Sequence, residues 1–241
     1  MFDALNVGIP RIAQQQKKLS IHKWNPRDFT RDKHRTVDDI PYGGGAGMVM
    51  LAEPLFATLT AARKILPTAT VVYLSAQGKT LEHQGVVDLA LNKEIIFLCG
   101  RYAGVDTRLI EQEIDMTCSI GDYVLSGGEL AAMVIIDAIA RQLPGVLHNA
   151  NSANEDSFAT GLLDYPRYTR PAEIKGLQVP KVLLSGNHAA IKRWRLKQAL
   201  GHTYLKRPDL LEKKLLSEQE QHLLTEFKRE YVAANKKEKQ R

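Results

Sequence analysis

The sequence predicts an α/β protein in which helices pack on a parallel sheet, followed by a smaller helical C-terminal domain. Short β-branched apolar runs alternate with segments of helical period, and a glycine-bearing loop follows each run, as in parallel sheets. The polar stretch 148–161 (HNANSANEDSFATG) then precedes a mostly helical region from Leu177 onward. We therefore expect a first domain at 1–148, a linker or loop at 149–161 and a helical domain at 162–241.

Three extended runs form the predicted sheet. The first is Thr70–Ser75 (TVVYLS), which ends at the turn signal Gln77-Gly78. The second is 94–99 (EIIFLC), which is followed directly by a glycine, and the third is the extended piece 118–125. Each run is short enough for a buried strand and ends in a segment typical of a turn.

Helices are predicted between and after these runs. Apolar residues recur on one helical face over 81–91, and a second helix spans 106–114 with Asp106 as its N-cap. A long helix follows at 129–142. In the C-terminal region, Asn187 is a candidate N-cap for a helix at 189–200, and Ser217 with Glu220 forms a capping-box pattern before a final helix.

The loops after the three strands are the candidate binding region. In open α/β sheets, ligands bind outside the carboxyl ends of the strands. Those ends carry LSAQG at 74–78, CGRYAG at 99–104 and LSGG at 125–128, which we expect to converge on one pocket. For any single loop, simple turn chemistry explains the glycine equally well.

Charge is unevenly distributed along the chain. Residues 1–35 carry eight Lys/Arg against three acids, residues 36–159 seven against fifteen, and residues 160–241 eighteen against nine. Basic ends around an acidic middle are compatible with a polyanion bound by the flanks, and equally with solvated surfaces. The charge therefore admits nucleic acid as a partner without indicating a reaction.

Several function classes lack support. No apolar run approaches membrane-spanning length and no signal-peptide pattern opens the chain, so we expect a cytoplasmic protein. Cys99 and Cys118 stand alone in apolar runs and are expected to be buried reduced thiols. The histidines show no metal spacing, and no metal site is assigned. Neither a P-loop, a GxGxxG fingerprint nor a Ser/His/Asp arrangement is present.

Four further features are ambiguous by themselves. The glycine-dense segment 42–48 (YGGGAGM) is typical of a loop that either approaches a ligand or simply turns. Asp156 fits the start of a short helix, and Arg141 fits the C-terminal end of the helix at 129–142. The basic stretch 192–197 (KRWRLK) is either a nucleic-acid face or a solvated helix surface on which only Trp194 packs inward.

The order of these motifs resembles one family closely, over Met1 to about Phe227. The motifs NPRDF (25–29), RTVDD (35–39), YGGGAGM, LSAQG, CGRYAGVD, SIGDYVLSGGE, NEDSF, GLLDYPRYTRP and VLLSGNH…RWR occur in the same sequence in the bacterial tRNA (guanine-N1)-methyltransferases of the knotted SPOUT class. The resemblance implies a deep trefoil knot, a homodimer with its active site at the subunit interface, and S-adenosylmethionine as methyl donor. It also implies tRNA with G36-G37 as substrate and methylation of N1 of guanosine 37.

The resemblance also assigns residues. The family's general base falls on Asp156 and its assisting arginine on Arg141, which would stabilise charge on guanine O6. Asp38 and Ser152 match positions near the target guanines, and Arg193 and Arg195 fall in the basic helix of the tRNA-binding domain. The methyl donor maps onto Tyr73, Leu74, Ser75, Gln77, Gly100, Ile120, Gly121, Asp122, Tyr123, Val124, Leu125, Gly127 and Gly128. Mg²⁺ is a further candidate cofactor with no residue assigned to it.

The sequence departs from the family at a few positions. Ala46, Ala76 and Ala131 stand where proline is common, and Ala103 stands where glutamate is common. The family usually opens with an apolar strand before Phe-Pro-Glu-Met-Phe, whereas this chain begins at the Met-Phe, so either a strand is lacking or the start is set late. These departures motivate an alternative, a tRNA-binding protein of the same fold with weakened or lost catalysis. A Rossmann oxidoreductase is a third reading, which lacks its glycine fingerprint.

Overall fold

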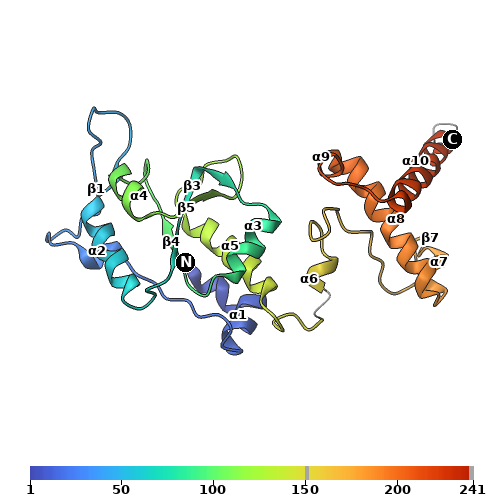
Figure 1. Cartoon of the computed structure of the whole chain (residues 1–241), viewed down its shortest axis with the longest axis horizontal. Helices are drawn as coiled ribbons and strands as arrows, with labels where there is room; N and C mark the ends of the chain where they lie inside the picture. Colours follow the sequence, from blue (N-terminus) through green and yellow to red (C-terminus); the bar gives the residue numbers. More distant parts are fainter. Residues whose placement is uncertain (150–151, 239–241) are drawn as a thin grey trace. The chain divides into compact units, whose positions relative to one another are not determined.

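The structure is a computed structural model that describes residues 1–149 and 152–238. The chain divides into two compact units, Met1–Ala150 and Asn151–Arg241 (Figure 1). The first unit holds the sheet and the second is mostly helical. The functions that the sequence assigns to the two domains and their linker stay predictions.

The sheet of the first unit has three parallel strands. They are β3 (Thr70–Thr80), β4 (Ile95–Cys99) and β5 (Met116–Ser119), in the order β4-β3-β5. Val72 of the central strand lies opposite Phe97 on one side and Met116 on the other. The predicted parallel sheet is confirmed, and all three carboxyl ends lie at one edge.

Two strand boundaries differ from the prediction. Strand β3 continues through Gln77-Gly78 to Thr80, and Cys118 is paired first with Leu74 and then with Lys79 across an irregularity. A Cβ at Gly78 would lie 2.6 Å from backbone atoms of Cys118, so glycine here permits close strand contact and does not end the strand. The third run ends early because Gly121, at φ +153°, leaves the extended region.

Helices cover both faces of this sheet (Figure 1). Alternate residues of β3 face opposite ways: Val71 packs with α2 (Ala52–Arg63) and α4 (Thr107–Glu113), whereas Val72 packs with α3 (His83–Leu91) and α5 (Glu129–Gln142). All three predicted helices of this region are present. The Asp106 side chain accepts the backbone N–H of Arg108, which confirms the predicted N-cap of α4.

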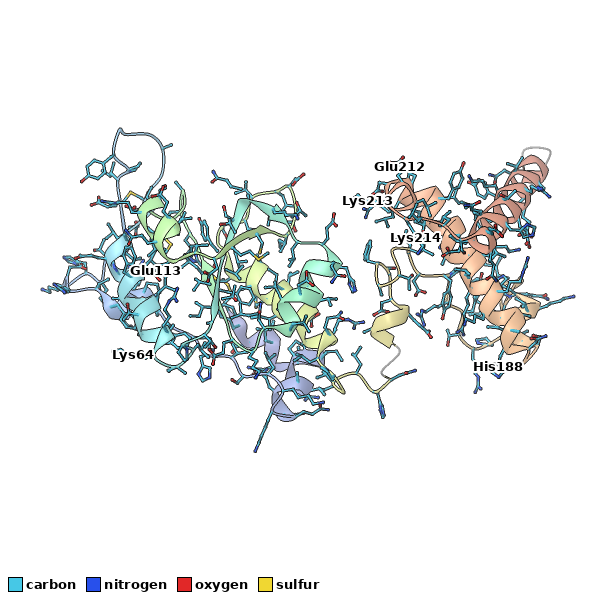
Figure 2. The ribbon with its side chains drawn as sticks, viewed as in Figure 1. Lys64, Glu113, His188, Glu212, Lys213 and Lys214 are labelled. Atoms are coloured by element: carbon cyan, nitrogen blue, oxygen red, sulfur yellow. The ribbon has the colours of Figure 1, made fainter. Side chains whose placement is uncertain are left out.

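The N-terminal segment packs around this core. It comprises the 3-10 helix η1 (Phe2–Asn6), α1 (Gly8–Gln15), the 3-10 helix η2 (Pro26–Phe29) and the short antiparallel strands β1 (Asp38–Asp39) and β2 (Val49–Met50). Ala13 of α1 is fully buried against Ala140 of α5. Glu113, labelled in Figure 2 at the end of α4, pairs with Arg63 of α2 at 3.1 Å.

The second unit is built from α6 (Ser152–Glu155), α7 (Lys181–Leu184), α8 (His188–Lys206), α9 (Pro208–Glu212) and α10 (Glu218–Glu238). Asn187 caps α8 by accepting the N–H of Ala190, and Ser217 and Glu220 exchange side-chain-to-backbone hydrogen bonds, so both predicted caps are confirmed. The sequence missed a hairpin of β6 (Glu173–Ile174) and β7 (Leu177–Gln178). It turns at Lys175-Gly176, where both residues have positive φ.

The basic stretch 192–197 of α8 is only partly solvated. This corrects the expectation that Trp194 alone packs inward there. Lys197 is buried, with 8% of the residue exposed, and its Nζ lies 2.8 Å from Glu226 and 2.7 Å from Glu230 of α10. Arg193 also pairs with Glu226, at 2.6 Å. Sequence periodicity could not place Lys197 inside, because its partners lie about thirty residues away on another helix.

This cluster predicts acid sensitivity. Hydrogen bonds from Arg193 and Lys197 lower the pKa of Glu226 to about 2, from an ordinary value of 4.5. A carboxylate with a depressed pKa stabilises the fold above its unfolded-state pKa, and that contribution is lost as the pH falls through its folded-state pKa. In urea unfolding at pH 6 and pH 3, Glu226→Gln should lose less stability on acidification than wild type. Glu212→Gln on α9 is the control; equal losses in both variants would contradict the prediction.

Candidate functional site

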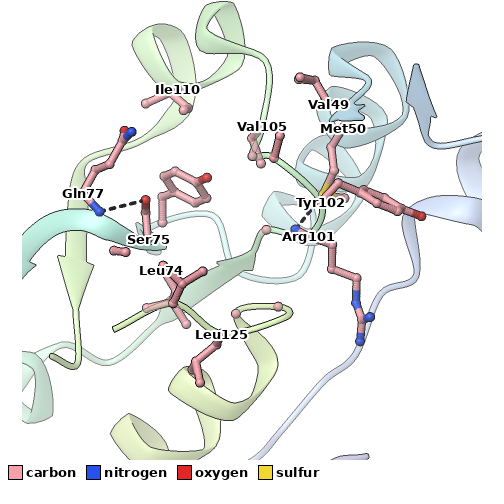
Figure 3. Close-up of a pocket in the computed structure, with 18 of the residues that line it drawn as sticks. Val49, Met50, Leu74, Ser75, Gln77, Arg101, Tyr102, Val105, Ile110 and Leu125 are labelled. Carbon is pink, nitrogen blue, oxygen red and sulfur yellow. Dashed lines mark hydrogen bonds between the residues drawn. The ribbon is translucent and has the colours of Figure 1, made fainter. Parts of the chain in front are cut away.

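The three strand-end loops line one cavity of about 1010 Å³ in the first unit (Figure 3). Its wall includes residues 74–77 of β3, residues 100–105 after β4 and, at and beyond the end of β5, residues 118–121 and 123–128, together with residues 39–42 and 49–51. This is the convergence that the strand-end pattern predicts. The cavity is large enough for a drug-sized ligand.

Most of the residues assigned to the methyl donor line this cavity. Asp122 is the exception: it is exposed and lies outside the lining. The assigned residues in the wall are Tyr73, Leu74, Ser75, Gln77, Gly100, Ile120, Gly121, Tyr123, Val124, Leu125, Gly127 and Gly128.

At two glycines of the wall, an added side chain would press against a neighbouring part of the wall. A Cβ at Gly128 would lie 2.8 Å from Cα of Cys99, and one at Gly100 would lie 3.0 Å from the Tyr73 ring. The N–H of Gly128 donates to the carbonyl of Gly100 at 2.8 Å. The loop after β4 and the start of α5 are therefore in backbone contact, which leaves main-chain groups at the cavity wall.

Polar contacts hold the loops in place. Arg101 pairs with Glu129 of α5 at 2.6 Å, which joins the second loop to the third. The N–H of Arg101 points at the sulfur of Met50 at 3.2 Å, and the N–H of Gln77 donates to Ser75 Oγ at 3.2 Å, both dashed in Figure 3. These contacts fix the shape of the cavity before a ligand arrives.

Sequence reasoning left out several wall residues, of which Tyr102 is the most unusual. It has φ +60°, a strained conformation for an aromatic residue, and its hydroxyl accepts a hydrogen bond from Arg27 at 3.2 Å. Its position within CGRYAG was the only sequence signal. The same wall includes Ala76, Ala103 and Ala131, three of the positions that depart from the family pattern.

The two cysteines are unsuited to nucleophilic chemistry. Both are free; Cys118 is buried and Cys99 is half-buried. Burial raises the pKa of Cys118, and burial with the nearby Glu129 carboxylate raises the pKa of Cys99 to about 12. Both are therefore thiols at neutral pH, and the thiolate is the reactive form.

The other candidates are divided between the two units. Half-buried Arg141 lies in the last turn of α5, and half-buried Asp38 lies in β1 of the first unit. Asp156, also half-buried, directly follows α6 in the second unit. Ser152 begins α6, but its side chain lies outside the described part of the structure. The structure thus gathers the donor-pocket candidates, whereas the candidate base belongs to a different compact unit.

Arg193 and Arg195 differ although they are two residues apart on α8. Arg193 is committed to Glu226, as described above. Arg195 instead lies over the Tyr165 ring, with its guanidinium carbon 4.9 Å from the ring centroid. Because Arg193 is paired with a carboxylate and Arg195 lies over an aromatic ring, Arg195 is the more available of the two to bind an anion.

Within residues 1–149 and 152–238, no three His, Cys, Asp or Glu side chains gather as a metal site would require. No helix there is both long and apolar enough to cross a membrane.

Comparison with known proteins identifies the family. The sequence profile of the family tRNA (Guanine-1)-methyltransferase TrmD matches residues 1–213. The chain belongs to this family. It is 59% identical to the tRNA (guanine-N(1)-)-methyltransferase of Nitrosococcus oceani over 98% of this chain and 94% of that protein. It is 56% identical to the proteins of the same name from Serratia marcescens, over 97% of this chain and 92% of that one, and Escherichia fergusonii, over 96% and 92%.

Membership in the tRNA (guanine-1)-methyltransferase family accounts for the order of motifs that the sequence displays. Methyl transfer is therefore the reaction whose methyl donor the cavity has to accommodate. The roles of individual residues stay predictions.

Proposed function

We propose that the chain is an S-adenosylmethionine-dependent enzyme that methylates N1 of guanosine 37 in tRNA with G36-G37, acting in the cytoplasm. The observation that carries the proposal is the near full-length similarity to tRNA (guanine-N(1)-)-methyltransferases, together with a cavity built from the strand-end loops.

The cavity fits the proposed methyl donor. Its wall combines apolar side chains such as Leu74 and Leu125 with polar ones such as Ser75 and Gln77, as an amphiphilic nucleoside requires. Gly100 and Gly128 allow a ligand to lie against backbone, where a Cβ would collide with the protein itself. S-adenosylmethionine would supply an electrophilic methyl group on a sulfonium.

Asp156 is proposed as the general base. N1 of guanine carries a proton at neutral pH, so its lone pair becomes available only as that proton leaves. A carboxylate within hydrogen-bond reach takes the proton while N1 forms its bond to the methyl carbon. S-adenosylmethionine would supply that carbon and would keep the electron pair of the broken carbon–sulfur bond, so that it would leave as a neutral thioether. The target base must be turned out of its stack to reach such a pocket.

Arg141 is proposed to stabilise the charge that develops on O6. As N1 loses its proton, negative charge spreads to O6, and a planar guanidinium can donate hydrogen bonds to it. Replacing Arg141 by Lys tests this role: the rate constant for methyl transfer should fall, while the affinity for tRNA should stay unchanged.

Asp38 and Ser152 are proposed to contact the target guanines, and the helical second unit is proposed to bind tRNA.

We further propose a homodimer in which the base and the donor loops come from different subunits. Leu130 and Val134, one turn apart on α5, are 47% and 54% exposed, and Val124 in the loop before α5 is 87% exposed. Apolar side chains grouped on an exposed helix face are typical of an interface. Sedimentation analysis that gave only monomer at micromolar concentration would contradict the dimer.

A trefoil knot is proposed for the connections around β4 and β5. The chain after β5 returns against the loop after β4, where Gly127 forms an antiparallel bridge with Arg101. The proposed knot would thread the chain at this contact, which is a rare exception among folds. We also propose that Mg²⁺ assists the reaction at an unassigned position; activity that is unchanged in EDTA would contradict it.

Transfer of a labelled methyl group tests the proposed function. The substrates are two unmodified tRNA transcripts that are identical except that one has G36-G37 and the other has A37. We expect label on the first transcript alone. Tight tRNA binding with no label on either would favour the second candidate, a tRNA-binding protein without catalysis, which Ala103 in the cavity wall motivates.

A further inference from the structure

Two arginines share one tyrosine ring in the second unit. The guanidinium carbons of Arg167 and Arg195 each lie 4.9 Å from the centroid of the Tyr165 ring. Tyr165 is half-buried, while both arginines are exposed. We call these three residues the Tyr165 cluster. Cation–π attraction holds each guanidinium at the ring, although two like charges at one site repel each other.

The two positive charges are unequally compensated. Arg167 Nε lies 2.7 Å from Asp164 Oδ2, so its charge has a carboxylate partner. For Arg195, the ring is its only charge-stabilising contact within residues 1–149 and 152–238. Together with Asp164, the cluster therefore carries one net positive charge, held in a defined orientation by an aromatic ring.

The Tyr165 cluster lies close to the candidate base. The hydrogen bond from Arg167 to Asp164 is the main cause of a raised pKa for Arg167, and the Asp156 carboxylate adds to it. The backbone N–H of Asp164 also donates to Ser157 Oγ at 2.9 Å, which ties the cluster to the residue after Asp156.

We propose that Arg195 binds a backbone phosphate of the tRNA next to the nucleotide that Asp156 receives, and that Tyr165 and Arg167 position it. A guanidinium donates two parallel hydrogen bonds to a phosphate, and an arginine already fixed by a ring loses less conformational entropy on binding. This inference rests on the proposed function. It assigns phosphate binding to Arg195 and not to Arg193, because the guanidinium of Arg193 is paired with Glu226.

The experiment compares Arg195→Gln with Arg193→Gln in the full-length protein. The affinity for an unmodified tRNA transcript is measured at several salt concentrations. Each phosphate contact contributes about 0.9 to the slope of log affinity against log salt for duplexes and about 0.7 for single strands. We expect Arg195→Gln to weaken binding several-fold and to flatten the slope by roughly that amount. Arg193→Gln should flatten the slope less than Arg195→Gln, because the Arg193 guanidinium is already paired with Glu226, and Tyr165→Leu should reproduce part of the Arg195 effect.

The outcomes are separable. Equal slopes for Arg195→Gln and wild type, or equal flattening in both arginine variants, would overturn the proposed phosphate site. Wild-type protein that binds tRNA but does not methylate it would overturn the proposed activity. In that case the salt slopes of the two arginine variants would still decide whether Arg195 binds a phosphate. Wild-type protein that does not bind tRNA would overturn both. Thermal unfolding of each variant checks that the second unit remains folded.

Discussion

Asp156→Asn should lower the single-turnover rate constant for methyl transfer by roughly 10²–10⁴, the range attributed to a positioned general base. Asparagine keeps the shape of the side chain but cannot accept the N1 proton. The affinities for tRNA and for S-adenosylmethionine should stay within a few-fold of wild type. Rapid-quench measurement with enzyme in excess over tRNA isolates the chemical step from product release.

Glu155→Gln is the matched control for this variant. Glu155 is the preceding acid in the chain and is exposed, whereas Asp156 is half-buried. Removal of either charge changes the local electrostatics similarly, but only Asp156 is proposed to take the proton. Similar rates for Asp156→Asn and wild type would remove Asp156 from the mechanism. Loss of tRNA binding in Asp156→Asn alone would assign it to substrate binding.

Elements governed by local signals could be predicted from the sequence. The helix Glu129–Gln142 has the predicted bounds, and the caps at Asp106, Asn187 and Ser217 form as predicted. A cap depends on residues two or three positions away, so the sequence contains all the information that it needs. The convergence of the strand-end loops was predictable for a related reason: all parallel strands point the same way.

Features that depend on tertiary contacts could not be predicted. The sequence reads Gln77-Gly78 as a turn, yet the strand continues there because Cys118 of a neighbouring strand passes against Gly78. Lys197 is buried because two glutamates of α10 face it, and nothing within one helical turn indicates this. Likewise, the strained backbone of Tyr102 leaves no local sequence signal beyond its glycine neighbours.

For the candidate site, the donor pocket could be predicted from the residues themselves, whereas the general base could not. Its donor pocket follows from a local strand–loop pattern repeated three times. Asp156, by contrast, stands in a segment whose composition equally suits a short helix, and α6 does occur there. Its proposed role came from the family resemblance, because no periodicity or spacing connects a residue of the second unit to a cavity of the first.

Gly128→Ala should reduce the affinity for S-adenosylmethionine by roughly tenfold to a hundredfold. The added Cβ would lie 2.8 Å from Cα of Cys99 and 3.2 Å from the backbone nitrogen of Gly100, atoms that cannot move aside as a side chain does. The start of α5 and the loop after β4 must therefore separate, which changes the cavity wall. The overpacking should also cost about 1–3 kcal/mol of stability. Calorimetric titration and urea unfolding measure the two effects.

Gly85→Ala is the control for this substitution. Gly85 lies within α3, outside the cavity lining, and its added Cβ would meet the Cδ1 atom of Leu81, the mobile end of a side chain. We expect unchanged donor affinity there. Donor affinity in Gly128→Ala equal to that of wild type would show that the backbone contact between the loops does not shape the donor site.

Combining the two variants tests whether each active site draws on two subunits. Asp156→Asn retains intact donor loops, and Gly128→Ala retains an intact carboxylate. In a mixed dimer, one of the two sites would pair the intact loops of one subunit with the intact carboxylate of the other. At a donor concentration too low to occupy the Gly128→Ala loops, co-expression in equal amounts should then restore about a quarter of the wild-type rate, since about half of the dimers are mixed. If base and loops came from the same subunit, no mixed dimer would contain an intact site, and activity would stay at the level of the separate variants.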